Sequence, residues 1–474
     1  MNEPIGKAGA PTYQQELSRS IGLASSVSIT LSAVTPAASS FVIVPLIITS
    51  VGTGSITSMI LAGLVGLFMA LCWAELGAMF PVSGGDYSLV WHAFKGLSPL
   101  SAGVASFLTF SMMLSSIAVI PATLALGTGD YLKDIWQVQP QIAGAVVTAA
   151  ATLVAVLRVR RAALITGLFL AVEMAVLAVI TILGFAHWRR NPVEFITHPA
   201  MGTLNIGSRP VAFTAILSLT AVAIFAYNGY SFPVFYSEET VGHSRQIARA
   251  ILISLGITAV TEIIPLLAVL VGSPSVEALA TSGQPFAYFL LATSNPIVNT
   301  LVSLGIVLAI FNAVAANIVA FGRILFATGR DKAWPGRISI WLARIHPSLH
   351  TPVLSTVLVG VIGVALCLTV SLDLLVVLGG TSLVLNYAMV ALAGLVGRAT
   401  GSTSQSPYKM PGWPLPPLLA LGALAYVMNE QTPTLWIVTS VLCAIAVGYY
   451  FLYLWPRRER AWQMLMPNVQ QDGD

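Results

Sequence analysis

Long apolar runs, separated by short polar segments, make up most of the 474-residue chain. A helix of about 20 apolar residues is long enough to cross the hydrocarbon core of a bilayer. Runs of roughly this length predict twelve membrane-spanning helices, near residues 22–49, 56–80, 98–127, 140–157, 162–187, 211–237, 246–272, 296–327, 352–371, 373–397, 415–431 and 433–456. The pattern predicts an all-α integral membrane protein. We expect one transmembrane domain at 21–456, with polar cytosolic tails at 1–20 and 457–474.

Two of these apolar runs are interrupted in the middle. The first contains Thr35-Pro36-Ala37-Ala38-Ser39-Ser40, and the second contains Phe225-Ala226-Tyr227-Asn228-Gly229-Tyr230-Ser231-Phe232-Pro233. Proline and glycine interrupt helical hydrogen bonding, and lipid cannot satisfy the backbone groups that are then left unpaired. Irregular backbone at this depth persists only where it packs within protein or lines a cavity. The two breaks are therefore predicted to lie inside the helix bundle.

The breaks fall in the first and sixth predicted spans. An offset of five spans turns the second unit upside down relative to the first, as an inverted repeat requires. We expect repeats at about 22–187 and 211–397, with two additional helices at about 415–456. Broken helices in corresponding positions indicate a secondary transporter that works by alternating access, with its substrate site at the breaks. A short apolar stretch, Pro285–Leu291, predicts a loop helix that caps the pathway.

The composition agrees with a membrane protein, and the distribution of positive charge predicts how the protein is oriented in the membrane. The chain is 56% hydrophobic and 8% charged, whereas soluble domains carry about 25% charged residues. With both termini in the cytosol, only four of the 22 lysines and arginines fall on the outer side, namely Lys133, Arg189, Arg190 and Arg209. Such asymmetry is typical of cytoplasmic (inner) membrane proteins. We therefore expect the lipid bilayer as a partner and no binding of nucleic acid.

Five motifs occur in the order and spacing of a known family. They are Ala74-Glu75-Leu76 with Pro81 and Ser83-Gly84-Gly85-Asp86-Tyr87; Phe225-Ala226-Tyr227-x-Gly229-Tyr230 with Ser237-Glu238-Glu239; Gly322-Arg323 with Gly329-Arg330-Asp331; Thr351-Pro352-Val353; and Pro411-Gly412-Trp413-Pro414. The series extends along essentially the whole chain and resembles the amino acid–polyamine–organocation (APC) superfamily of permeases. The resemblance implies twelve helices in a five-plus-five inverted repeat, and it places Phe225 where the family often has a gating aromatic.

Three positions depart from the family pattern. The small glycine-containing motif of the first span falls on Ala38-Ser39-Ser40, and the acid of the sixth span falls on Ser231. Many proton-coupled members also have a lysine early in the fifth span, but Ala162–Thr166 contains none. The missing acid favours a neutral or modestly polar amino acid over a polycation. The missing lysine argues against proton coupling, although the sequence does not by itself separate proton from sodium coupling.

The predicted substrate site consists of the two breaks. Unpaired N–H groups at one helix end suit a carboxylate, and carbonyls at the opposing end suit an ammonium group, so the pair could hold a zwitterion. The predicted substrate-binding residues are Thr35, Pro36, Ala37, Ala38, Ser39, Ser40, Phe225, Ala226, Tyr227, Asn228, Gly229, Ser231 and Asn312. Because a helix turns about 100° per residue, Asn312 and Asn317 cannot both face the pathway. Asn312 is preferred as the one that lines it. Asn228 either hydrogen-bonds the ligand or satisfies the unwound backbone. We expect no catalytic residue, cofactor or metal.

Acidic residues within the predicted spans are a separate feature. Glu173 and Glu262 lie deepest, and buried acids in a membrane are functional candidates. Each is predicted either to handle a proton or another ion, or to have a neutral, hydrogen-bonded structural role. Glu75 lies at the end of the second span and is expected to pair with a basic residue such as Arg323.

The predicted function is transport of an amino acid across the cytoplasmic membrane. The alternatives are a permease for a small amine such as ethanolamine or a polyamine, an amino acid exchanger and, outside transport, a membrane solute sensor. An intramembrane enzyme is disfavoured, because the six histidines lie in loops or at span edges and no zinc-protease or serine-hydrolase motif lies within a span.

Overall fold

The computed structural model describes residues 12–13, 19–82, 84–136, 138–157, 159–201, 210–242, 244–429, 433–464 and 466–467. Its elements are β1 (Thr12–Tyr13), α1 (Leu23–Val34), α2 (Pro36–Ala38), a π-helical turn (Ser39–Ile43), α3 (Val44–Val51), α4 (Ser55–Met79), α5 (Asp86–Phe94), α6 (Pro99–Trp136), α7 (Pro140–Ala155), α8 (Val159–Ala186), α9 (Val193–Thr197), α10 (Phe213–Ala226), two 3-10 turns (Phe232–Val234 and Ser237–Glu239), α11 (Arg245–Gly272), α12 (Val276–Thr281), α13 (Pro285–Thr293), α14 (Pro296–Arg330), α15 (Arg337–Leu342), α16 (Val353–Thr369), α17 (Leu372–Ala399), α18 (Leu415–Asn429), α19 (Pro433–Tyr449) and β2 (Met466–Pro467). Most of the predicted N-terminal tail lies outside the described residues.

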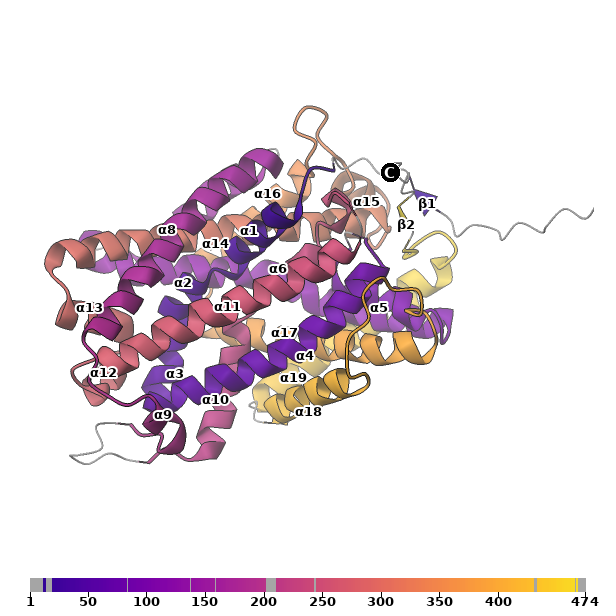
Figure 1. Ribbon diagram of the computed structural model, residues 1–474. Coiled ribbons are helices and arrows are strands. Elements are labelled where there is room, and N and C mark those ends of the chain that lie inside the picture. Colours follow the sequence, from indigo (N-terminus) through magenta and orange to yellow (C-terminus); the bar gives the residue numbers. More distant parts are fainter. Residues whose placement is uncertain are drawn as a thin grey trace, which may run out of the picture.

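The long helices form a single bundle (Figure 1). In that view, α9, α12 and α13 lie at one end, whereas α5, α15 and the paired strands β1 and β2 lie at the other. The segment α1–α2–α3 runs through the interior, where α1 and α2 contact α8, α11 and α14. The first interrupted segment is therefore surrounded by three other helices.

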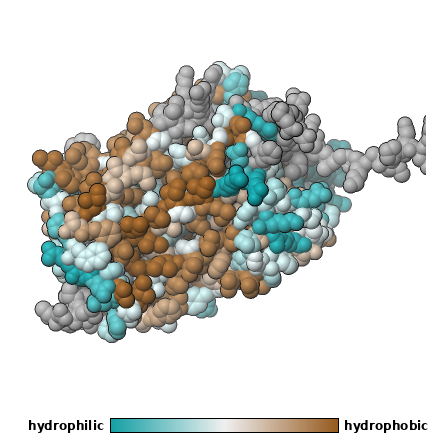
Figure 2. All heavy atoms as spheres, in the orientation of Figure 1, coloured by the Kyte–Doolittle hydropathy of each residue, from teal (hydrophilic) through white to brown (hydrophobic). Residues whose placement is uncertain are grey.

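The expectation of an all-α membrane protein is confirmed at this level. Among the described residues, seven helical stretches are long and apolar enough to cross a bilayer, and four shorter apolar helices accompany them. One face carries a broad apolar band across the middle, with hydrophilic residues gathered towards the two ends (Figure 2). A band of this extent on a soluble monomer would be exceptional. The count of twelve spans and the inverted repeat stay predictions.

The first predicted break is present but shorter than expected. Helix α1 ends at Val34, and Thr35 adopts a left-handed conformation with φ of 49°. This conformation is unusual for a β-branched residue. Pro36 then begins α2, a position where the N–H that proline lacks would have had no helical partner. The chain resumes a helical course at Pro36, so Thr35 is the left-handed residue of the break, and the short α2 and the π-helical turn from Ser39 follow it.

The second break is longer. Helix α10 ends at Ala226, and turns replace the remainder of the predicted span up to Ser237–Glu239. Gly229 has φ of 118°, and a Cβ atom at this position would lie 3.0 Å from a methyl group of Val34. Only glycine fits both the backbone conformation and the space. Gly229 thus lets the second break pack directly against the last residue of α1.

The predicted loop helix at Pro285–Leu291 is also present, as α13. Its Phe286 is buried, and its ring packs edge-on against Phe41 with the ring centroids 5.1 Å apart. Because Phe41 lies in the π-helical turn after the first break, α13 covers the chain leading away from that break.

Buried ion pairs cross-link the end of the bundle where α14 ends. Arg323 Nε lies 2.9 Å from Glu239 Oε1, with both side chains about 2% exposed. Arg330 contacts Glu238 and Asp331, and Tyr87 donates a hydrogen bond to Asp331. The pairs join the turn after the second break to α14.

Glu75 pairs with a basic residue, as expected, but the partner is Arg398 and the suggested Arg323 is wrong. Glu75 instead accepts two hydrogen bonds from Arg398, at 2.9 and 2.8 Å, and two more from Thr403 and the Met410 backbone. The reason is tertiary, since the end of α17 packs against α4 and places Arg398 beside Glu75.

Replacing Glu239 with Gln is expected to lower thermal stability, because Arg323 would keep a buried charge with no anionic partner. Loss of one partner of a buried pair typically costs about 3–5 kcal/mol. The measurement is the melting temperature of the detergent-purified protein. Glu277→Gln is the matched control because Glu277 is exposed. Equal melting temperatures for the two variants would show that the pair does not stabilise the fold.

Candidate functional site

A side chain of the first break hydrogen-bonds the backbone of the second. Ser39 Oγ donates to the carbonyl oxygen of Ala226, the last residue of α10, over 2.9 Å. Ser39 is 3% exposed and Ala226 1%. The segments that contain the two breaks therefore meet at one buried point in the bundle.

Neighbouring helices satisfy other backbone groups at the first break. Asn317 Nδ2 of α14 donates to the Ala33 carbonyl over 3.0 Å, and Glu173 Oε1 of α8 accepts from the Ala37 N–H over 2.9 Å. The Thr35 hydroxyl donates to the Ser32 carbonyl. Buried backbone groups without partners are costly, so these side chains make a broken helix tolerable in an apolar interior.

A small cavity of about 20 Å³ lies beside the second break. Asn228 and Ser231 line it, together with Asp86, Asn386 and Tyr387 among others. The Tyr387 hydroxyl donates to Asn228 Oδ1 over 2.9 Å. The Asn228 side chain is therefore hydrogen-bonded to another side chain, whereas the sequence predicts contact with either the ligand or the unwound backbone.

Asp86 is the charged residue of this cavity, and the sequence reasoning did not select it. Trp73 Nε1 and Asn386 Nδ2 donate to its two carboxylate oxygens over 2.6 and 2.5 Å. Asp86 begins α5, between two predicted spans, and burial raises its pKa to about 6 although both hydrogen bonds oppose the rise. The only available sequence signal was an acid directly after Gly84-Gly85.

The remaining predicted residues are buried or partly buried. Thr35 to Ser40 and Phe225 to Gly229 lie at the two breaks, all of them in the interior or partly so. Asn312 lies beside Glu173, and the helix that carries it, α14, also contacts α2 of the first break. Asn317, which was ranked lower, is the asparagine that contacts the break. Contact of any of these residues with substrate stays a prediction.

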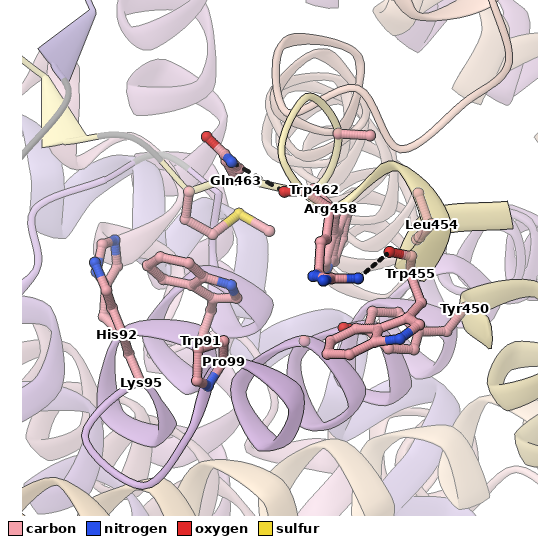
Figure 3. A pocket seen from close by; sticks show the side chains of 13 residues that line it. Trp91, His92, Lys95, Pro99, Tyr450, Leu454, Trp455, Arg458, Trp462 and Gln463 are labelled. Atoms are coloured by element: carbon pink, nitrogen blue, oxygen red, sulfur yellow. Dashed lines mark hydrogen bonds between the residues drawn. The ribbon is translucent and has the colours of Figure 1, made fainter.

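Two much larger cavities are also lined by described residues, and the second of them borders the chain directly after the first break. One, of about 350 Å³, lies between α5 and the segment that follows α19 (Figure 3). Lys95 lies over the Trp91 ring and Arg458 over the Trp455 ring on its two sides. The other, of about 450 Å³, is lined by Phe41, Pro45, Gln284 and neighbouring residues near α12 and α13. Volume alone therefore does not identify the substrate site.

Comparison with known proteins decides the family. The sequence profile described as "Amino acid permease" matches residues 21–449. The chain belongs to the amino acid permease family. This permease is 23% identical to the methylthioribose transporter of Bacillus subtilis (strain 168) over 421 residues, which cover 85% of this chain and 87% of that protein. It is 24% identical to the branched-chain amino acid permease BcaP of the same organism over 424 residues, with the same coverage.

A mammalian relative matches a shorter part. The large neutral amino acids transporter small subunit 2 of Homo sapiens is 27% identical over 306 residues, which cover 62% of this permease and 54% of that protein. Together with the apolar helices, these matches make the protein a multi-pass membrane transporter of the APC superfamily rather than an enzyme.

Replacing Asn317 with Ala is expected to lower both stability and transport, because the Ala33 carbonyl would lose its donor at the break. An unsatisfied buried group costs about 1–3 kcal/mol. Thermal unfolding and uptake into proteoliposomes measure the two effects. Asn299→Ala is the matched control, since this half-buried amide lies in the first turns of the same helix. An unchanged melting temperature in Asn317→Ala would contradict a role for this hydrogen bond.

Proposed function

We propose that this permease moves a neutral amino acid across the cytoplasmic membrane by alternating access, with the substrate bound where the two breaks meet. The observation that carries the proposal is the hydrogen bond from Ser39 to the Ala226 carbonyl, which joins the segment that restarts after Thr35 to the last residue of α10, where the second break begins. Broken helices of this kind present backbone donors and acceptors to the two ends of a zwitterion. Binding then needs few charged side chains.

The character of the lining supports a neutral substrate. Ser231 supplies no charge, and the Asp86 carboxylate already accepts hydrogen bonds from Trp73 and Asn386. Two relatives are named for branched-chain and for large neutral amino acids. A third is named for methylthioribose, so the family by itself does not fix the substrate.

A small amine is the second candidate, and Asp86 is the observation that favours it. Its carboxylate borders the same cavity as Asn228 and Ser231. An ammonium group without a carboxylate, as in ethanolamine, would find an anionic partner there.

The experiment is an uptake panel in proteoliposomes. L-[³H]leucine uptake is measured with L-isoleucine, L-glutamate, L-lysine, ethanolamine or putrescine as competitors. Neutral amino acids are expected to compete most strongly. Ser39→Leu should abolish uptake, because the larger side chain fills the space at the breaks and removes the donor to Ala226. Uptake of radiolabelled ethanolamine or putrescine without any uptake of leucine would favour the second candidate, and wild-type uptake by a folded Ser39→Leu protein would place the site elsewhere.

Phe225 is proposed to close over the substrate. It lies in the last turn of α10, is 8% exposed, and has its ring tip about 4.0 Å from the position that a Cβ on Gly379 of α17 would occupy. Phe225→Ala is expected to reduce uptake at least ten-fold in a folded protein, because nothing would then separate the substrate from water on that side. Phe225→Trp should retain more activity because it keeps a flat ring. Equal uptake by Phe225→Ala and the wild-type protein would contradict a gating role.

A further inference from the structure

Two carboxyl groups lie behind the first break, and the substrate site does not use them. Glu173 of α8 and Glu262 of α11 have exposed fractions of 0%. Helices α8 and α11 pack against one another, and α2 contacts both. The two acids are close enough to interact electrostatically, and Glu262 lies beside Ser39.

The hydrogen bonds of these acids are incomplete. Glu173 Oε1 accepts from the Ala37 N–H. Within the described part of the chain, no side chain or backbone group meets Glu173 Oε2, either oxygen of Glu262, the Asn312 amide or the Tyr227 hydroxyl at full hydrogen-bonding geometry, although Asn312 lies beside Glu173 and Ser39 beside Glu262. The described salt bridges involve other acids, namely Glu75, Glu238, Glu239 and Asp331. No described cation therefore neutralises Glu173 or Glu262.

An isolated carboxylate in such an interior is costly, and two neighbouring ones also repel each other. Protonation removes the charge without requiring a cavity or further ligands. The cavities described above are lined by other residues. We propose that Glu173 and Glu262 form a proton-binding site whose loading and release are coupled to the transport cycle. This inference rests on the proposed transport function.

Ser39 supplies the link between this site and the substrate site. Its hydroxyl has one proton, which it donates to the Ala226 carbonyl in this structure. An ionised Glu262 would compete for the same proton, because a carboxylate is a stronger acceptor than a carbonyl. Release of the proton from Glu262 would then free Ala226 and loosen the contact between the breaks. Glu173 acts on the same segment, since an ionised carboxylate holds the Ala37 N–H more strongly than a neutral one.

The surroundings of Glu262 contain few other titratable groups. Among the described residues, Glu173 of α8 and Tyr227 of the turn after α10 interact with it. Helix α14 presents the neutral Asn312 beside Glu173. Helix α4 also packs on α11, but its Glu75 is paired with Arg398. Proton exchange at this site is therefore assigned to the two glutamates.

The test separates proton coupling from transport itself. Wild type, Glu173→Gln and Glu262→Gln are reconstituted in proteoliposomes. Accumulation of L-[³H]leucine driven by a pH gradient is compared with its exchange by counterflow, which needs no gradient. Both variants are expected to lower the ratio of accumulation to counterflow by about ten-fold or more. Glu277→Gln, with its exposed side chain, should keep the wild-type ratio.

Infrared difference spectra recorded on a pH change give a readout that does not depend on substrate. The wild-type protein should show a band from a buried protonated carboxyl group that Glu262→Gln or Glu173→Gln reduces. Loss of this band together with the lowered ratio supports the proposal. An unchanged spectrum in both variants, a wild-type ratio in both, or accumulation driven by sodium instead of protons would overturn it. Absence of any leucine transport by the wild-type protein would contradict the proposed function, and the infrared titration alone would then decide whether the proton site exists.

Discussion

The structure depends on satisfying backbone groups at two interrupted helices inside an apolar bundle. Each unpaired buried group would cost about 1–3 kcal/mol, more than a typical hydrogen bond contributes. Three side chains from three segments meet this need, since Asn317 binds the Ala33 carbonyl, Glu173 binds the Ala37 N–H and Ser39 binds the Ala226 carbonyl. The breaks therefore have a fixed geometry, although the helices around them are largely apolar.

This requirement explains where polar residues are placed along the bundle. The fully paired charges gather at the end where α14 terminates, as in the contacts of Arg323 with Glu239 and of Arg330 with Glu238. Near the first break, the described acids and amides, such as Glu173 and Asn312, have no described cation as a partner. The ion pairs at the end of α14 fix the turn after the second break to that helix. Neutral or singly ionised groups near the breaks can exchange their hydrogen-bond partners. A transporter needs both, because its helices must move as units around a site that alters.

The sequence predicts the position of the breaks well, because Pro36 and Gly229 act locally on the backbone. It predicts their partners poorly, because these come from distant helices. Glu75 pairs with Arg398 rather than Arg323 owing to the packing of α17 on α4. Asn317 was ranked below Asn312, yet it is the one that binds the break. The twelve-span topology, the inverted repeat and every substrate contact stay predictions.

The structure explains why the first break can have alanine and serine where the family pattern has glycine. Ala38 and Ser39 have φ of −61° and −57°, which any residue adopts, because Pro36 restarts the helix before them. The left-handed conformation falls on Thr35 instead, whose hydroxyl binds the Ser32 carbonyl. The first break therefore does not need glycine at Ala38 or Ser39. Having a side chain at Ser39 then provides the hydroxyl that joins this break to Ala226, a contact that glycine at this position would not supply.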